Sequence, residues 1–90
     1  MNNRRRKTIH TLSEQIDSIR IALEELKETL VNVQDEEQEY LDCIPENLQG
    51  SERASAAEEA VSNLDEAVYG MDDVISGLEE IVSNLDAASE

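Results

Sequence analysis

The sequence contains no phenylalanine, no tryptophan and only two tyrosines among its 90 residues. Its apolar side chains are therefore mostly Ile, Leu, Val and Ala, which suit packing between helices better than an aromatic-lined ligand pocket. No stretch alternates apolar and polar residues between turn signals, so we predict no β-strand. A chain of this length forms at most one small domain, and small helical proteins often gain buried area by oligomerising.

The chain is also poor in residues that build reactive centres. Cys43 is the only cysteine, which excludes an internal disulfide framework and a paired-cysteine metal site. His10 is the only histidine and has no Cys or His partner, and neither a glycine-rich phosphate loop nor an EF-hand loop is present. On a helical chain, serine, histidine and acidic residues also lack an oxyanion hole. We therefore predict no enzymatic activity, no catalytic residues, no cofactor and no metal.

Long apolar runs are missing as well. No segment is long and apolar enough to cross a membrane, and the basic start is not followed by the apolar segment of a secretory signal. We therefore expect a cytoplasmic protein that has no membrane partner.

Basic residues are scarce outside the first seven positions. The chain carries 22 acidic residues against seven Lys and Arg, which gives a net charge of −15 at pH 7. Four of the basic residues lie at the start, and this basic arm consists of Arg4, Arg5, Arg6 and Lys7. No Lys or Arg follows Arg53. Such a surface repels nucleic acids and anionic membranes, and it either attracts a basic partner protein or simply keeps the protein soluble.

What the sequence has instead is a seven-residue repeat. Between residues 9 and 44 apolar residues recur at alternating steps of three and four, which is typical of a long helix in a coiled coil or bundle. With the heptad positions lettered a to g, position a holds Ile9, Ile16, Leu23, Leu30, Glu37 and Ile44, and position d holds Leu12, Ile19, Leu26, Val33 and Tyr40. We expect these two rows to form the buried seam of the first helix, which only Glu37 interrupts.

The second half keeps the same repeat and adds a third apolar row. Position a holds Ala54, Val61, Val68, Ile75 and Val82, position d holds Ala57, Leu64, Met71, Leu78 and Leu85, and position g holds Ala60, Ala67, Val74, Ile81 and Ala88. A seam between two helices needs only positions a and d, so the wider face fits a helix with more than one neighbour. We expect two hairpins to pack as a homodimer into a four-helix bundle, with a monomer or a hetero-complex as the alternatives.

A turn separates the two helices. Pro45 ends the first helix because it lacks an N–H and disfavours a helical residue before it, and Ser51 or Ser55 can cap the second. The predicted organisation is a basic arm or frayed helix start over residues 1–7, a helix over 8–44, a turn over 45–51 and a second helix over 52–88. The fold class is thus an all-α, coiled-coil-like antiparallel hairpin, because so short a connection makes the helices antiparallel neighbours.

An antiparallel hairpin brings specific residues together at each end. Near the turn, Tyr40 and Glu37 should face the alanines of the second helix, and Glu37 either contacts Arg53 or is solvated. At the other end, the basic arm should lie near Asp86 and Glu90, where the opposite charges partly neutralise each other.

The segment DEEQEYLDCIPENLQGSERASAAEEAVSNLDEAV, residues 35–68, carries a resemblance. An acidic helix end, an aromatic residue, a PENLQ-S-R turn and an AEEAV stretch follow one another. This segment resembles small, acidic, uncharacterised proteins of bacteriophages and prophages of Firmicutes and other gut bacteria. The resemblance implies a phage or mobile-element origin and a helical hairpin, and it implies no activity.

Three functions are compatible with these patterns. The first is a phage-type accessory protein that binds another, unidentified protein as an adaptor or inhibitor. The second is an acidic decoy that imitates nucleic acid and blocks a basic host DNA-binding or defence protein. The third is a structural or assembly factor whose basic arm holds nucleic acid. The first two would act in the cytoplasm of a bacterial host, and the third could also act in the virion.

The candidate binding residues follow from these functions. Nucleic acid could be held by Arg4, Arg5, Arg6 and Lys7. Protein-binding candidates are Tyr40, Pro45, Glu46, Asn47, Leu48, Arg53, Tyr69, Asp72, Asp73, Glu79 and Glu80.

Overall fold

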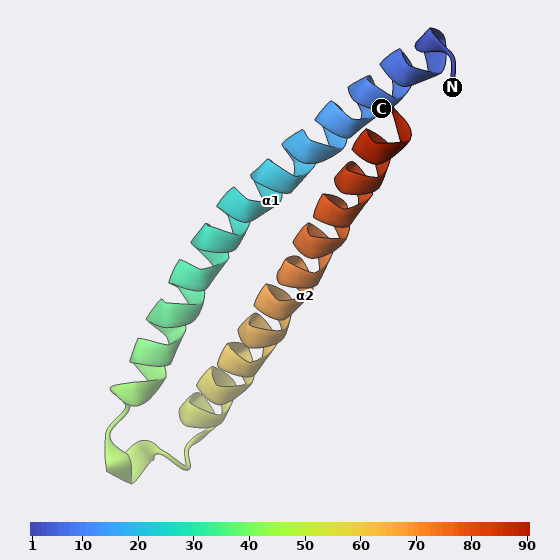
Figure 1. Cartoon of the computed structure of the whole chain (residues 1–90). Coiled ribbons are helices and arrows are strands. Elements are labelled where there is room, and N and C mark those ends of the chain that lie inside the picture. The colour runs from blue at the N-terminus through green and yellow to red at the C-terminus, as the bar shows by residue number, and fades with distance from the viewer. The chain divides into compact units, whose positions relative to one another are not determined.

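The computed structural model describes residues 1–90 and contains two long α-helices joined by a short turn (Figure 1). Helix α1 spans Asn3–Asp42, the 3-10 helix η1 spans Glu46–Leu48, and helix α2 spans Glu52–Ala88. There is no β-strand, and the prediction of an all-α helical hairpin is confirmed. Neither helix is long and apolar enough to span a membrane.

The chain divides into two compact units. The terminal unit contains residues 1–26 and 71–90, and the turn unit contains residues 27–70. In the terminal unit the first part of α1 and the last part of α2 run antiparallel. In the turn unit the last part of α1 is connected through η1 to the first part of α2 (Figure 1).

Helix α1 begins five residues before the predicted position 8 and ends two residues before the predicted position 44. At its start, the side-chain Oδ1 of Asn2 accepts a hydrogen bond from the backbone N–H of Arg5 at 2.9 Å, which satisfies one of the free donors of the first turn. The basic arm is therefore the first turn and a half of α1. At its end, Pro45 restricts the backbone of Ile44, so the helix cannot continue to the proline.

The turn is held by hydrogen bonds of its own. The backbone N–H of Leu48 donates to the carbonyl of Pro45 at 2.8 Å, and the side chain of Gln49 donates to the carbonyl of Ile44 at 2.7 Å. Of the two serines that could cap α2, Ser51 does so, because its Oγ accepts the N–H of Ala54 at 3.3 Å. Ser55 lies inside the helix.

The core of the turn unit is formed by Ile44, Ala54 and Ala57, with Leu41 packed against them. The expectation that Tyr40 faces the alanines is wrong, since Tyr40 is 44% exposed. The small side chains of α2 let the helices approach closely, and the two residues that turn inward on this part of α1 are Leu41 and Ile44. Glu37 is half-buried, and it forms no ion pair with Arg53, which is exposed.

The terminal unit has a thinner core. Ile75 is its only buried apolar residue, with 6% of its surface exposed. Half-buried side chains line the contact on both helices. They are Ile9, Ile16 and Leu23 on α1, and Met71, Leu78, Val82 and Leu85 on α2.

The predicted seam of α1 is wrong in one of its two rows. Position a faces α2, but the five residues at position d are exposed, and Leu26 is the most exposed of them at 59%. We call this set the outer row of α1, and it consists of Leu12, Ile19, Leu26, Val33 and Tyr40. The side of α1 that faces α2 is instead occupied by position e, where Ser13 is buried and Arg20 and Gln34 are half-buried. Ser13 and Gln34 face α2 because each donates a hydrogen bond to an aspartate of that helix.

Candidate protein-binding surfaces

A row of polar contacts flanks the apolar contact between the helices in each unit. In the terminal unit the Ser13 hydroxyl donates a hydrogen bond to the Asp86 carboxylate at 2.8 Å. In the turn unit the Gln34 amide donates to the Asp65 carboxylate. All four residues occupy heptad position e, so we call this feature the polar seam. Buried or half-buried polar groups are stable only when they find partners, and position e of α2 supplies acceptors at regular intervals.

Arg20 belongs to the same seam. Its Nε and Nη1 bond the carboxylates of Asp17 and Glu24 at 2.8 and 3.0 Å. The hydrogen bond that Arg20 donates to Asp17, together with the negative charges of Asp17, Glu24 and Glu79, the last on α2, raises the pKa of Arg20 above its ordinary value. The Arg20 guanidinium offsets part of the acidic charge on this side.

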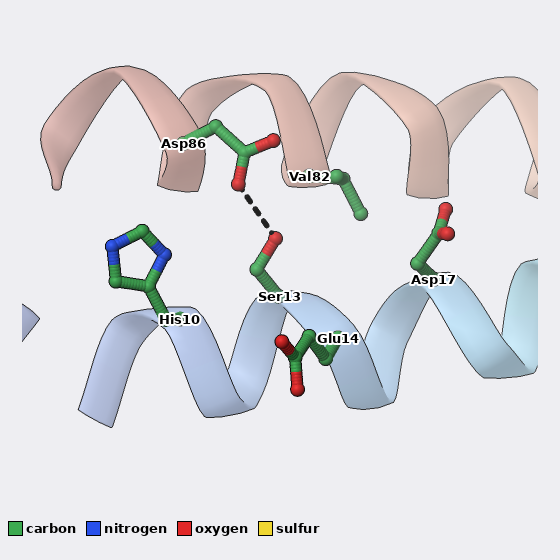
Figure 2. A pocket seen from close by; sticks show the side chains of 6 residues that line it. All are labelled: His10, Ser13, Glu14, Asp17, Val82 and Asp86. Atoms are coloured by element: carbon green, nitrogen blue, oxygen red, sulfur yellow. Dashed lines mark hydrogen bonds between the residues drawn. The ribbon is translucent and has the colours of Figure 1, made fainter. Parts of the chain in front are cut away.

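A shallow groove of about 300 Å³ follows the polar seam in the terminal unit. It is lined by His10, Ser13, Glu14, Asp17, Val82 and Asp86 (Figure 2). Ser13 points at Asp86 across the groove, whereas Glu14 turns away from α2 (Figure 2). The Ser13 hydroxyl donates its hydrogen bond to Asp86 on α2 and not to His10 on its own helix. The groove therefore lies at a polar contact between α1 and α2. No group of three or more His, Cys, Asp or Glu side chains in the chain is arranged to hold a metal ion.

The basic arm forms no ion pair within the chain. Arg4, Arg5 and Lys7 are exposed, and half-buried Arg6 donates to the Oδ1 of Asn3 at 3.3 Å. No ion pair joins any of the four to an acidic residue, so Asp86 and Glu90 form no direct contact of this kind with the basic arm. The carboxylate of Asp86 is instead hydrogen-bonded to Ser13 in the polar seam.

The turn candidates lie close together. Pro45, Glu46, Asn47 and Leu48 form η1 and the residue before it, and all four are exposed. Arg53 is exposed in the first turn of α2. This turn presents one large apolar side chain, Leu48, among polar ones, which is a small contact surface.

The acidic stripe of α2 divides into two rows. At position e, Asp65 and Asp72 are half-buried and lie on the side that faces α1. At position f, Glu66, Asp73 and Glu80 are exposed. The remaining candidates, Glu79 and Tyr69, are exposed too, and Tyr69 has 70% of its surface free. The structure thus leaves one regular acidic row, at position f, open to a partner.

The outer row of α1 is the surface that our interpretation of the sequence missed, because we assigned position d to the core. A second exposed apolar row lies on α2 at position g, where Val74 and Ile81 are the large members. A signal for the correct assignment was present. Position e of α1 holds polar or basic residues at most turns, and position e of α2 is acidic throughout residues 58–86, so the two rows are complementary.

Two glycines lie inside α2 beside this second row. A Cβ atom added to Gly70 or Gly77 would meet nothing within 4 Å. We expect Gly70→Ala to raise the free energy of unfolding by about 1 kcal/mol, since alanine loses less backbone entropy than glycine in a helix. Urea denaturation at low protein concentration, followed by circular dichroism, would measure the change. An unchanged or lower stability would contradict the open space that surrounds the added Cβ atom.

A comparison of the chain with protein-family models, curated proteins and solved structures found no match.

Proposed function

We propose that this protein is a non-enzymatic accessory protein of the phage type, which acts by binding another protein as an adaptor or inhibitor. One observation carries the proposal. Five apolar residues are buried, whereas eleven large apolar residues are exposed, most of them in regular rows along the helices. Helices that leave such rows uncovered are typical of proteins that bury them against a partner.

The proposal includes self-association of two hairpins into a four-helix bundle, because a single hairpin leaves the outer rows uncovered. It places the protein in the bacterial host cytoplasm, where its partner would meet either the outer rows or the turn around Leu48. A partner that binds through apolar contacts would be insensitive to salt, because screening acts on charges only.

The exposed acidic row at position f supports a second candidate, the nucleic-acid-mimicking decoy. Glu66, Asp73 and Glu80 recur every seven residues, which is about 10 Å along a helix. A basic DNA-binding cleft would be attracted to such a row, and that attraction would weaken steeply as salt is raised.

A pull-down distinguishes the two candidates. The tagged protein is mixed with a nuclease-treated bacterial lysate and washed at low and at high salt. A matched pair of variants accompanies the wild type. The first neutralises the acidic row of α2 (Glu66→Gln, Asp73→Asn and Glu80→Gln), and the second makes the same charge change at position f of α1 (Glu14→Gln, Glu28→Gln and Asp35→Asn).

The adaptor proposal expects one dominant partner that survives high salt and both variants. The decoy hypothesis predicts a basic partner that is released by high salt and that fails to bind only the α2 variant. Recovery of the tagged protein alone, from lysates of every host tested, would contradict both candidate functions.

A further inference from the structure

In the terminal unit the exposed apolar rows of the two helices lie on the same side. On each helix the polar seam runs along one flank of the buried row, and the exposed apolar row runs along the other flank. Because the polar flanks meet, as Ser13 and Asp86 do, the apolar flanks also lie together. They form one apolar face that consists of Leu12, Ile19 and Leu26 on α1 and Val74 and Ile81 on α2, all of them exposed.

This apolar face is also free of charge. The positions that border it are occupied by Gln15 and Ala22 on α1 and by Gly77 and Asn84 on α2. For a chain with a net charge of −15, this is unusual, and it makes the face the one side of the terminal unit where a second acidic chain can approach without strong repulsion.

The exposed surface area of the chain is larger than that expected for a monomer of its mass, which is compatible with the binding of a second copy. A folded monomer of this mass, 10.1 kDa, usually exposes about 5,300 Å², whereas this chain exposes 6565 Å². The excess of about 1,300 Å² is larger than the roughly 800 Å² that each partner buries in a standard interface, so the chain has enough surface to form one.

The orientation of that copy follows from the charges on α1. The basic arm lies at the N-terminus of α1, and an acidic end, which we define as residues 35–42 with five Asp and Glu, lies at its C-terminus. Both oppose the helix macrodipole, since the first turn contains no acidic residue and the last turn no basic one. Neither end forms an ion pair within the chain.

We propose that the apolar face binds a second copy of the chain in antiparallel orientation, with the basic arm of each copy beside the acidic end of α1 in the other. Two antiparallel copies of α1 bring the unpaired charges together in opposite-sign pairs and align the helix dipoles favourably, whereas parallel copies bring like charges together. This inference rests on the self-association proposed above and specifies its surface and direction.

The surface is tested by Ile19→Glu, with Ser18→Glu as the matched control. Both positions are exposed in α1, so neither variant disturbs the fold of the hairpin, which circular dichroism verifies. Sedimentation equilibrium should give a dimer for the wild type and for Ser18→Glu. Ile19→Glu should weaken the dimer by about 100-fold or more, because two carboxylates then enter one symmetric apolar interface.

The direction is tested by cross-linking through Cys43, the only thiol, with a flexible bis-maleimide. Thr8 lies near the start of α1 and Cys43 follows the last residue of α1, and the helix between them is about 50 Å long, so a thiol introduced by Thr8→Cys cannot reach Cys43 of its own copy. In the antiparallel dimer the introduced thiol of one copy should cross-link to Cys43 of the other, and the wild type should give no cross-linked dimer. Peptide mass spectrometry identifies the joined positions.

The possible failures are distinguishable. A wild-type protein that stays monomeric at all concentrations would overturn this inference together with the proposed bundle, but it would leave binding to a different protein unaffected. A dimer that survives Ile19→Glu, or a wild-type dimer cross-linked through two copies of Cys43, would overturn the inference alone.

Discussion

Replacement of Ile44 by alanine is expected to lower the free energy of unfolding by about 2–4 kcal/mol. Ile44 is 93% buried against Ala54, Ala57 and Leu41, and it is the largest buried side chain of the turn unit. Its truncation removes apolar contacts and leaves a cavity. The helices cannot close that cavity by moving together, because the alanines opposite Ile44 already allow the closest approach.

Leu48→Ala is the matched control for this change. Leu48 lies four residues further along the turn and is 42% exposed, so its truncation should change the stability by less than about 0.5 kcal/mol. Urea denaturation of both variants measures the difference. Amide hydrogen exchange should show that Ile44→Ala speeds exchange first in residues 27–70, which form one unit. Equal losses for the two variants would contradict the assignment of Ile44 to the core.

Ile75→Ala should have a comparable effect on the terminal unit, a loss of about 2–4 kcal/mol. Ile75 is the only buried apolar residue of that unit, so the contact between the two helices there depends on it more than on any other side chain. Ile81→Ala is the control, since it makes the same change in the same helix at a position that is 45% exposed.

Protein concentration separates the roles of these two isoleucines. Ile75→Ala should destabilise the protein to the same extent at low and at high concentration, because Ile75 packs within its own chain. Ile81→Ala should matter only at concentrations at which the apolar face is covered by a second copy. A large effect of Ile81→Ala at low concentration would contradict the exposure of Ile81 within its own chain.

Much of the fold could be predicted from the sequence because its strongest signals are local. The apolar rows at positions a and d of the second half predict a helix, and they face α1 as expected. Pro45 and Ser51 act on the backbone beside them, so the turn and the start of α2 lie where these residues place them. Such effects depend on neighbours in the sequence and need no knowledge of the partner helix.

The face of α1 could not be predicted in the same way. A heptad pattern shows that positions a and d are apolar, but it does not show which neighbour covers each row. Ser13 and Gln34 turn inward because Asp86 and Asp65 accept their hydrogen bonds, and those acceptors lie on the other helix. Because position e faces α2, Leu26 and Tyr40 are turned outward. They belong to the exposed apolar surface on which the proposed function depends.

The division into two units also has a consequence for the order of events during translation. The Gln34–Asp65 contact joins residues 31 apart in the sequence, whereas the Ser13–Asp86 contact joins residues 73 apart. A ribosome finishes all of α1 before it makes any residue of α2, and the positions that cover the start of α1 are synthesised last. We therefore expect the turn unit to form first, because its loop is shorter and it contains four of the five buried apolar residues. Until the last turns of α2 emerge, the start of α1 exposes all of its apolar residues, and a ribosome-bound chain that ends near residue 70 should bind a chaperone more strongly than the completed protein does.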